Sequence, residues 1–97
     1  MSVATVIGLP AVGDEGVASE LREALLKLIN EGQPVALDAA NVDELRSSLI
    51  QVVEAAAKSF SQHGLGFEMW APSDAVIAAY EDLGLFSNLM QIVATGE

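Results

Sequence analysis

Three short apolar runs alternate with three amphipathic stretches along this chain, and that order limits the folds that it can adopt. The runs at residues 3–10, 34–40 and 65–72 are rich in apolar side chains and each contains a Pro, which is typical of short strands bounded by turns. A repeated strand–helix order favours a mostly parallel sheet with right-handed crossovers. If the strands follow one another across the sheet, this handedness packs the helices mainly on one face. We therefore predict an α/β fold of this kind.

The amphipathic stretches repeat their apolar residues at steps of three and four, as α-helices do. The first spans residues 13–32, and its apolar stripe consists of Val17, Leu21, Leu25 and Leu28. The second gives the strongest signal, with apolar positions at Leu49, Val52, Val53, Ala56, Ala57 and Phe60. His63 and Gly64 are predicted to end this helix, because His suits the negative end of the helix dipole and Gly supplies a left-handed cap.

The third helix is predicted to follow Ser73, which is a favoured N-cap residue. Gly84 interrupts it, and residues 85–93 add one or two further apolar turns before a polar tail. Trp70 and Tyr80 are expected in the core or at its boundary, because amphipathic aromatic residues often lie where burial meets water.

The length and composition predict one small domain over residues 1–97, with its core over about residues 3–93. The chain has no Cys and a single His, so we expect no disulfide and no metal site. No apolar stretch reaches the roughly 18–20 residues that cross a bilayer, and the N-terminus lacks the basic start of a signal peptide. We therefore expect a cytoplasmic protein without membrane insertion.

Acidic residues outnumber basic ones by 14 to 4, which gives a formal net charge of −10 at pH 7. The basic residues are scattered and are Arg22, Lys27, Arg46 and Lys58. Such a chain repels phosphate backbones, so we expect no nucleic-acid partner. A basic protein surface suits it better, because complementary charge speeds encounter.

No catalytic motif stands out. The GxSxG element of a serine hydrolase is absent, and GLPAVGDEG at residues 8–16 contains neither GxGxxG nor GxxxxGK. These absences disfavour a nucleotide-hydrolysing module. We therefore expect no enzymatic activity and no cofactor.

Asp38 ends the second predicted strand, at the edge where open α/β sheets bind ligands. A receiver-type phosphoacceptor there would need companion acids after the first strand, which instead ends in Leu9 and Pro10, and a later lysine. No lysine follows Lys58. We therefore expect Asp38 to bond to amides of the following turn, as Asx residues commonly do.

Ser47 and Ser48 precede the strongest helical signal. Ser48 and Gln51 match the Ser-x-x-Gln capping box, which predicts that Ser48 caps the helix. Ser47 would then lie one residue outside the helix, close to its positive pole, where an added phosphate is electrostatically acceptable.

Four segments carry a resemblance to a known family: LPAVGDEGVASELREALLKL, PVALDAANVDEL, SSLIQVVEAAAKSFSQHG and FEMWAPSDAVIAAYEDLGL. Through them the chain resembles the STAS domain, the fold of anti-sigma factor antagonists. In family members switched by phosphorylation, an Asp-Ser-Ser-Gly element opens the second helix, and a partner kinase phosphorylates its first serine. Arg46, Ser47, Ser48 and Leu49 take these positions here. The resemblance implies Ser47 as the candidate phosphoacceptor, ahead of Ser48, although Arg46 and Leu49 depart from the pattern.

Short single-domain STAS proteins resemble this chain most, including its LPAV start and the IQVV of its helix. The resemblance implies a bacterial, non-enzymatic signalling regulator that binds a protein, with a chemotaxis histidine kinase or its response-regulator complex as the favoured partner. Its alternatives are an anti-sigma factor antagonist controlled by serine phosphorylation and a STAS subunit of a lipid-transport ABC system. The predicted partner-binding residues are Asp38, Asn41, Asp43, Glu44, Arg46, Ser47, Ser48 and Gln51.

Overall fold

A parallel sheet of four strands forms the centre of the fold in the computed structural model, which describes residues 4–94. The strands are β1 (Thr5–Gly8), β3 (Val35–Asp38), β5 (Phe67–Trp70) and β6 (Val93–Ala94), in the spatial order β1-β3-β5-β6. Every neighbouring pair is parallel, and the first three strands follow one another in chain order. The predicted α/β fold with a mostly parallel sheet is confirmed.

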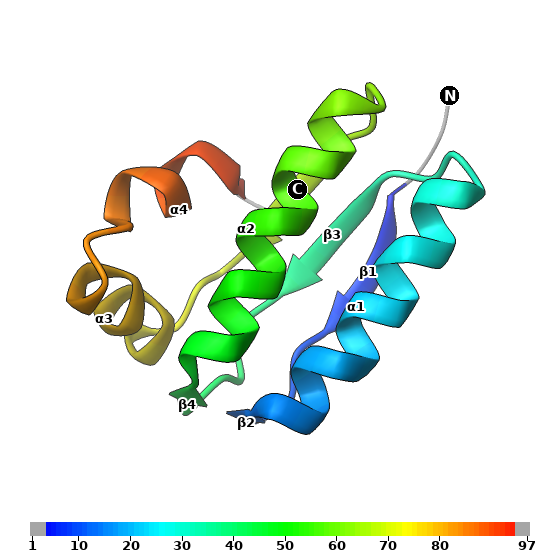
Figure 1. The fold of residues 1–97 in the computed structure, drawn as a ribbon. Helices are drawn as coiled ribbons and strands as arrows, with labels where there is room; N and C mark the ends of the chain where they lie inside the picture. Colours follow the sequence, from blue (N-terminus) through cyan, green and yellow to red (C-terminus); the bar gives the residue numbers. More distant parts are fainter. Residues whose placement is uncertain (1–3, 95–97) are drawn as a thin grey trace.

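Four helices connect the strands: α1 (Glu15–Asn30), α2 (Ser47–Gln62), α3 (Asp74–Asp82) and α4 (Phe86–Ile92). In Figure 1, α1 and α2 lie side by side over the same face of the sheet, and α3 and α4 lie beyond α2. This arrangement follows from the strand order, because right-handed crossovers in one direction across a sheet put their helices on one face.

The core lies between the sheet and this helical layer. Val35 and Leu37 of β3 are fully buried, as a central strand requires, and Leu49 and Phe60 of α2 pack in the same cluster. The Phe60 ring meets the Phe67 ring edge to face, with centroids 5.3 Å apart. Most residues of the two predicted helix stripes are buried, whereas Val17, Val52 and Ala57 are only half-buried. The burial of these stripes drives the packing of the helices onto the sheet.

Two of the predicted helix ends are confirmed. The Val76 amide donates to Ser73 Oγ at 3.4 Å, and this hydroxyl also donates to the Val42 carbonyl at 2.6 Å. His63 is the C-cap of α2, and Gly64 follows with a left-handed φ of 69°. Ser73 therefore both caps α3 and ties it to the loop after β3.

Three very short strands were not predicted. β2 (Val12–Gly13) and β4 (Glu44–Leu45) form a separate parallel pair, and β6 adds the last strand of the main sheet. Two residues are too few to show the alternation by which a strand is recognised in a sequence. The sequence predicts only apolar turns in the segment that contains α4 and β6.

A candidate partner-binding edge

The predicted partner-binding residues lie between the end of β3 and the second turn of α2. We call this set the docking edge. Its exposed members are Asn41, Asp43, Glu44, Arg46, Ser47 and Gln51. Asp38 and Ser48 are half-buried. Their position follows from the sheet, because the loops after parallel strands gather at its carboxyl edge.

The β2–β4 pair holds the docking edge against the loop after β1. The amides of Asp43 and Glu44 both donate to the Ala11 carbonyl, at 2.7 Å and 3.0 Å. The Arg46 amide donates to the Gly13 carbonyl at 2.8 Å. These bonds bring the start of α2 beside the start of α1, although the two lie more than 30 residues apart in sequence.

Gly13 allows this close approach. A Cβ at this position would lie 2.5 Å from Leu49 Cδ2 and 3.0 Å from Leu45 Cδ1. Leu49 is fully buried in the first turn of α2, so it has little freedom to move aside. The absence of a side chain at Gly13 therefore sets how closely the first turn of α2 packs against the β2–β4 pair.

The capping box predicted for Ser48 and Gln51 is wrong. The α2 helix begins at Ser47, its N-cap is Arg46 with an extended backbone (φ −85°, ψ 153°), and no side chain caps it. The reason is the β2–β4 pairing, which keeps the chain extended through Arg46 and so starts the helix two residues earlier than the box requires. Ser48 thus lies inside the helix, and its Oγ is buried without a hydrogen-bond partner among the described residues.

The two serines differ in access. Ser47 is exposed in the first helical position, whereas the Ser48 hydroxyl is buried. Both residues line a surface cleft between the starts of α1 and α2, together with Asp14, Glu15, Gly16 and Arg46. A phosphate on Ser47 would meet favourable charge from Arg46 and the helix terminus, and repulsion from the two carboxylates.

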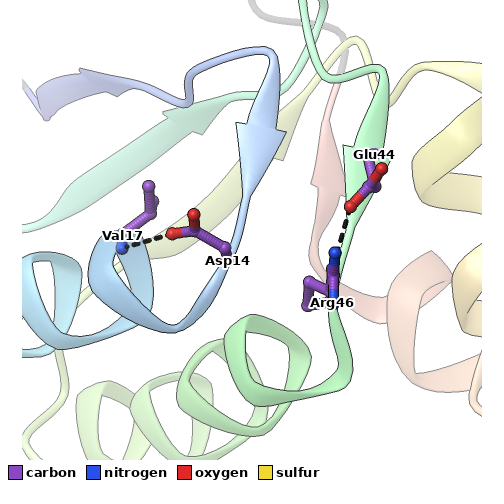
Figure 2. A network of polar contacts seen from close by, with 4 residues as sticks. All are labelled: Asp14, Val17, Glu44 and Arg46. Carbon is purple, nitrogen blue, oxygen red and sulfur yellow. Dashed lines mark hydrogen bonds and ion pairs between the residues drawn. The ribbon is translucent and has the colours of Figure 1, made fainter.

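Figure 2 shows how the charged groups around this cleft are held. Arg46 Nε donates to Glu44 Oε2 at 2.8 Å, so the cation of the docking edge is paired with an acid two residues before it. Across the cleft, Asp14 Oδ1 accepts from the Val17 amide at 3.1 Å and caps α1. The Arg46–Glu44 ion pair is exposed, so a partner can compete for it at small cost in stability.

The loop from β3 to β4 is anchored at both of its ends. Asp38 Oδ1 accepts from the Ala40 amide at 3.1 Å, which confirms the Asx turn predicted there. Val42 is buried, and its carbonyl is the acceptor for Ser73 Oγ. Asn41 is therefore presented on a loop that is fixed on either side of it.

Ser48 and Gln51 also line a groove of about 360 Å³ between α1 and α2. Its remaining lining is mostly apolar and consists of Arg22, Leu25, Leu26, Ile29, Val52, Ala55, Ala56 and Ser59. This groove extends the docking edge along the outer side of α2 and offers apolar surface next to polar groups.

Three residues that were not predicted at the docking edge lie next to it: Asp14, Glu15 and Gly16. The β2–β4 pair and the packing of α1 against α2 bring them to Ser47, and a strand pair of this length leaves no periodic pattern in the sequence. Among residues 4–94, no group of three or more His, Cys, Asp or Glu side chains is arranged to hold a metal ion. Within the same residues, no helix has the length and apolar character needed to span a membrane.

Of two comparisons with known proteins, the first identifies a family. The family model described as STAS domain matches residues 5–96, which is nearly the whole chain. A search of curated proteins finds no match.

Proposed function

Because the chain belongs to the STAS domain family, we propose that it is a signalling adaptor that binds a protein partner through the docking edge. STAS domains are protein-interaction domains. The favoured partner is a chemotaxis histidine kinase or its response-regulator complex. The observation that carries this proposal is the row of exposed polar side chains from Asp43 to Ser47, held in place by the β2–β4 pair.

The charges of the docking edge suit a largely basic partner surface. Asp43 and Glu44 are exposed on the edge, and Asp14 and Glu15 lie across the cleft. Arg46 is the one cation among the residues of the edge and would set the register by pairing with an acid of the partner. The groove beside Gln51 offers a site for an apolar anchor of the kind that contributes most to binding energy.

A second candidate function is anti-sigma factor antagonism controlled by phosphorylation of Ser47. The observation that favours Ser47 is its exposure at the start of α2, where the neighbouring Ser48 hydroxyl is buried. A phosphate there would break the Arg46–Glu44 pair in favour of a stronger Arg–phosphate contact, and it would repel Asp14 and Glu15. It would thereby reshape the surface that a partner meets.

The test is capture of the partner from native lysate by the full chain, followed by mass spectrometry and binding measurements with the purified partner. We expect chemotaxis components. Recovery of an anti-sigma kinase would favour the second candidate, and recovery of a lipid-transport ABC system would contradict both.

Arg46→Glu and Lys58→Glu provide a matched pair for the binding site. Arg46 is the N-cap of α2 and Lys58 lies within α2, and both are exposed. Each substitution changes the net charge by the same amount, so the two variants lose or gain the same long-range electrostatic attraction to the partner. Only Arg46→Glu alters the docking edge, and we expect it to weaken binding by about tenfold. Equal effects of the two variants would show that the edge is not the contact.

Phosphopeptide mapping of the protein from its native cells tests the switch. If Ser47 carries no phosphate and Ser47→Ala binds and signals like the parent, the second candidate is excluded and the docking edge works without modification.

A further inference from the structure

A second cluster of exposed side chains lies far from the docking edge in sequence, around the turn from α3 to α4. Six large apolar residues among residues 4–94 are exposed, and three of them fall between positions 83 and 90 of the chain: Leu83 (49 %), Phe86 (41 %) and Met90 (43 %). We call these three residues the C-terminal apolar patch. Single exposed apolar residues are common on protein surfaces, whereas clusters of them mark interaction sites.

The orientation of α4 explains why this patch faces outward. Leu89 is fully buried, and Asn88 Nδ2 donates to Glu54 Oε2 of α2 at 3.0 Å. These contacts fix one side of α4 against the rest of the protein. Phe86 and Met90 are four residues apart and therefore share a side of the helix, away from Asn88. The patch is thus displayed by a helix that is already anchored through other residues.

The charge around the patch restricts its occupant. Residues 59–97 contain no Lys or Arg, and their acids are Glu68, Asp74, Glu81, Asp82 and Glu97. Lys58 of α2 lines a pocket with Asn88, on the side of α4 away from Phe86 and Met90. Glu81 and Asp82 are exposed and directly precede Leu83. A second copy of the chain would bring like charges together, because each copy carries a net charge of −10. Anionic lipid surfaces and nucleic acids are disfavoured for the same reason.

We propose that the C-terminal apolar patch binds a cationic amphipathic helix of a protein partner. The apolar side of that helix would cover Phe86 and Met90, and its flanking Lys or Arg side chains would face Glu81 and Asp82. Phe86 is the anchor, and Met90 adapts to the shape of the partner. This site shares no residue with the docking edge. The proposal for this patch does not depend on the proposed binding at the docking edge.

Titration with a defined peptide tests this site. The probe is a fluorescein-labelled 18-residue peptide of Leu and Lys at amphipathic helical spacing, added to the full chain at low salt. We expect saturable binding with ¹⁵N chemical-shift changes concentrated in residues 81–92. Phe86→Ala should weaken binding by about 30-fold, the effect of losing an interface anchor.

Matched controls separate the patch from general attraction. Val6→Ala removes a similarly exposed apolar side chain from β1, away from both the docking edge and its groove, and should leave binding unchanged. A peptide of the same composition in scrambled order should bind far more weakly, because its apolar residues no longer share a face. The conservative Phe86→Leu variant should retain most of the affinity, and circular dichroism should show that each variant is folded.

Three results of the peptide titration would overturn the proposal. The scrambled peptide would bind as tightly as the amphipathic one, Val6→Ala would weaken binding as much as Phe86→Ala, or shift changes would centre on Asp43 to Gln51. Sedimentation that shows a dimer lost on Phe86→Ala would assign the patch to self-association and would equally contradict a cationic partner.

Discussion

The hydroxyls of Ser47 and Ser48 lie in different surroundings although the residues are adjacent. Ser47 is exposed, whereas Ser48 Oγ is buried and has no hydrogen-bond partner among the described residues. A buried polar group without a partner costs about 1–3 kcal/mol of stability. Ser73 is the opposite case, because its hydroxyl both accepts a cap bond and donates to a distant carbonyl.

We expect Ser48→Ala to leave stability unchanged or to raise it by up to about 1 kcal/mol, because it removes an unpaired hydroxyl and Ala favours a helix. Ser73→Ala should lower stability by about 1–3 kcal/mol, because it removes both the cap and the tie to Val42. Urea unfolding of both variants measures the difference. A loss of 1 kcal/mol or more at Ser48, on the scale of a lost cap, would show that its hydroxyl has a partner after all.

The burial of Tyr80 predicts how the stability of the protein changes at alkaline pH. Its side chain is fully buried, and this burial raises the pKa of the phenol above its ordinary value of 10.0, with a further contribution from the charge of Glu54. The unfolded chain therefore loses the phenol proton above about pH 10 while the folded protein keeps it. Stability should be independent of this group below pH 10 and should fall above it, by up to about 1.4 kcal/mol per pH unit.

Tyr80→Phe isolates that contribution, because the substitution removes only the phenol hydroxyl. We expect the variant to lose the additional fall in stability, as measured by urea unfolding between pH 9 and pH 12. Its stability at neutral pH should be equal or slightly higher, since the phenol hydroxyl has no hydrogen-bond partner among the described residues. Identical alkaline profiles of the two proteins would contradict this account.

At the scale of elements, the two-residue strands β2 and β4 control where α2 begins. Their pairing keeps Arg46 extended, and Gly13 lets Leu49 enter the core directly beneath them. The docking edge therefore depends on a strand pair that is too short to be stable by itself. Its support comes from the buried side chains of the helix that it positions.

Gly13→Ala tests this dependence. The added methyl group would collide with Leu49, so we expect a loss of about 1–3 kcal/mol, together with amide-shift changes at Arg46 and Ser47. Gly8→Ala is the control, because nothing lies within 4 Å of the Cβ that it would add. If both variants unfold at the same urea concentration as the parent, the close packing at Gly13 is not required.

At the scale of the whole molecule, the dominant property is the charge of −10 on 97 residues. The single ion pair found among the described residues joins Arg46 and Glu44, which leaves most of the acids without a nearby cation there. Self-repulsion therefore opposes the compact state, and dissolved salt should screen it.

We expect the melting temperature to rise between 10 mM and 500 mM NaCl. A gain of about 1 kcal/mol corresponds to about 4–8 °C for a domain of this size. The same salt range should weaken binding to a basic partner, because the attraction is screened as well. A melting temperature that falls over this range would mean that favourable ion pairs outweigh the repulsion.

The parallel sheet, the main helices and much of the core could be predicted because long amphipathic stripes and apolar runs repeat with clear periods. Val53 and Phe60 belong to such a stripe, and both are buried. Ser73, His63 and the Asx turn at Asp38 could also be predicted, since caps and turns depend on contacts within a few residues.

At the docking edge, only the tertiary structure decided where α2 begins and which residues lie beside its start. The sequence by itself determined that Ser47, Ser48 and Gln51 stand near the start of a helix, but a local capping rule placed that start two residues too late. The β2–β4 pair, formed between segments about 30 residues apart, set the start at Ser47 and brought Asp14 and Glu15 to it. Long-range pairing of two residues leaves no local signal, because its energy comes from the buried neighbours and not from the pair itself.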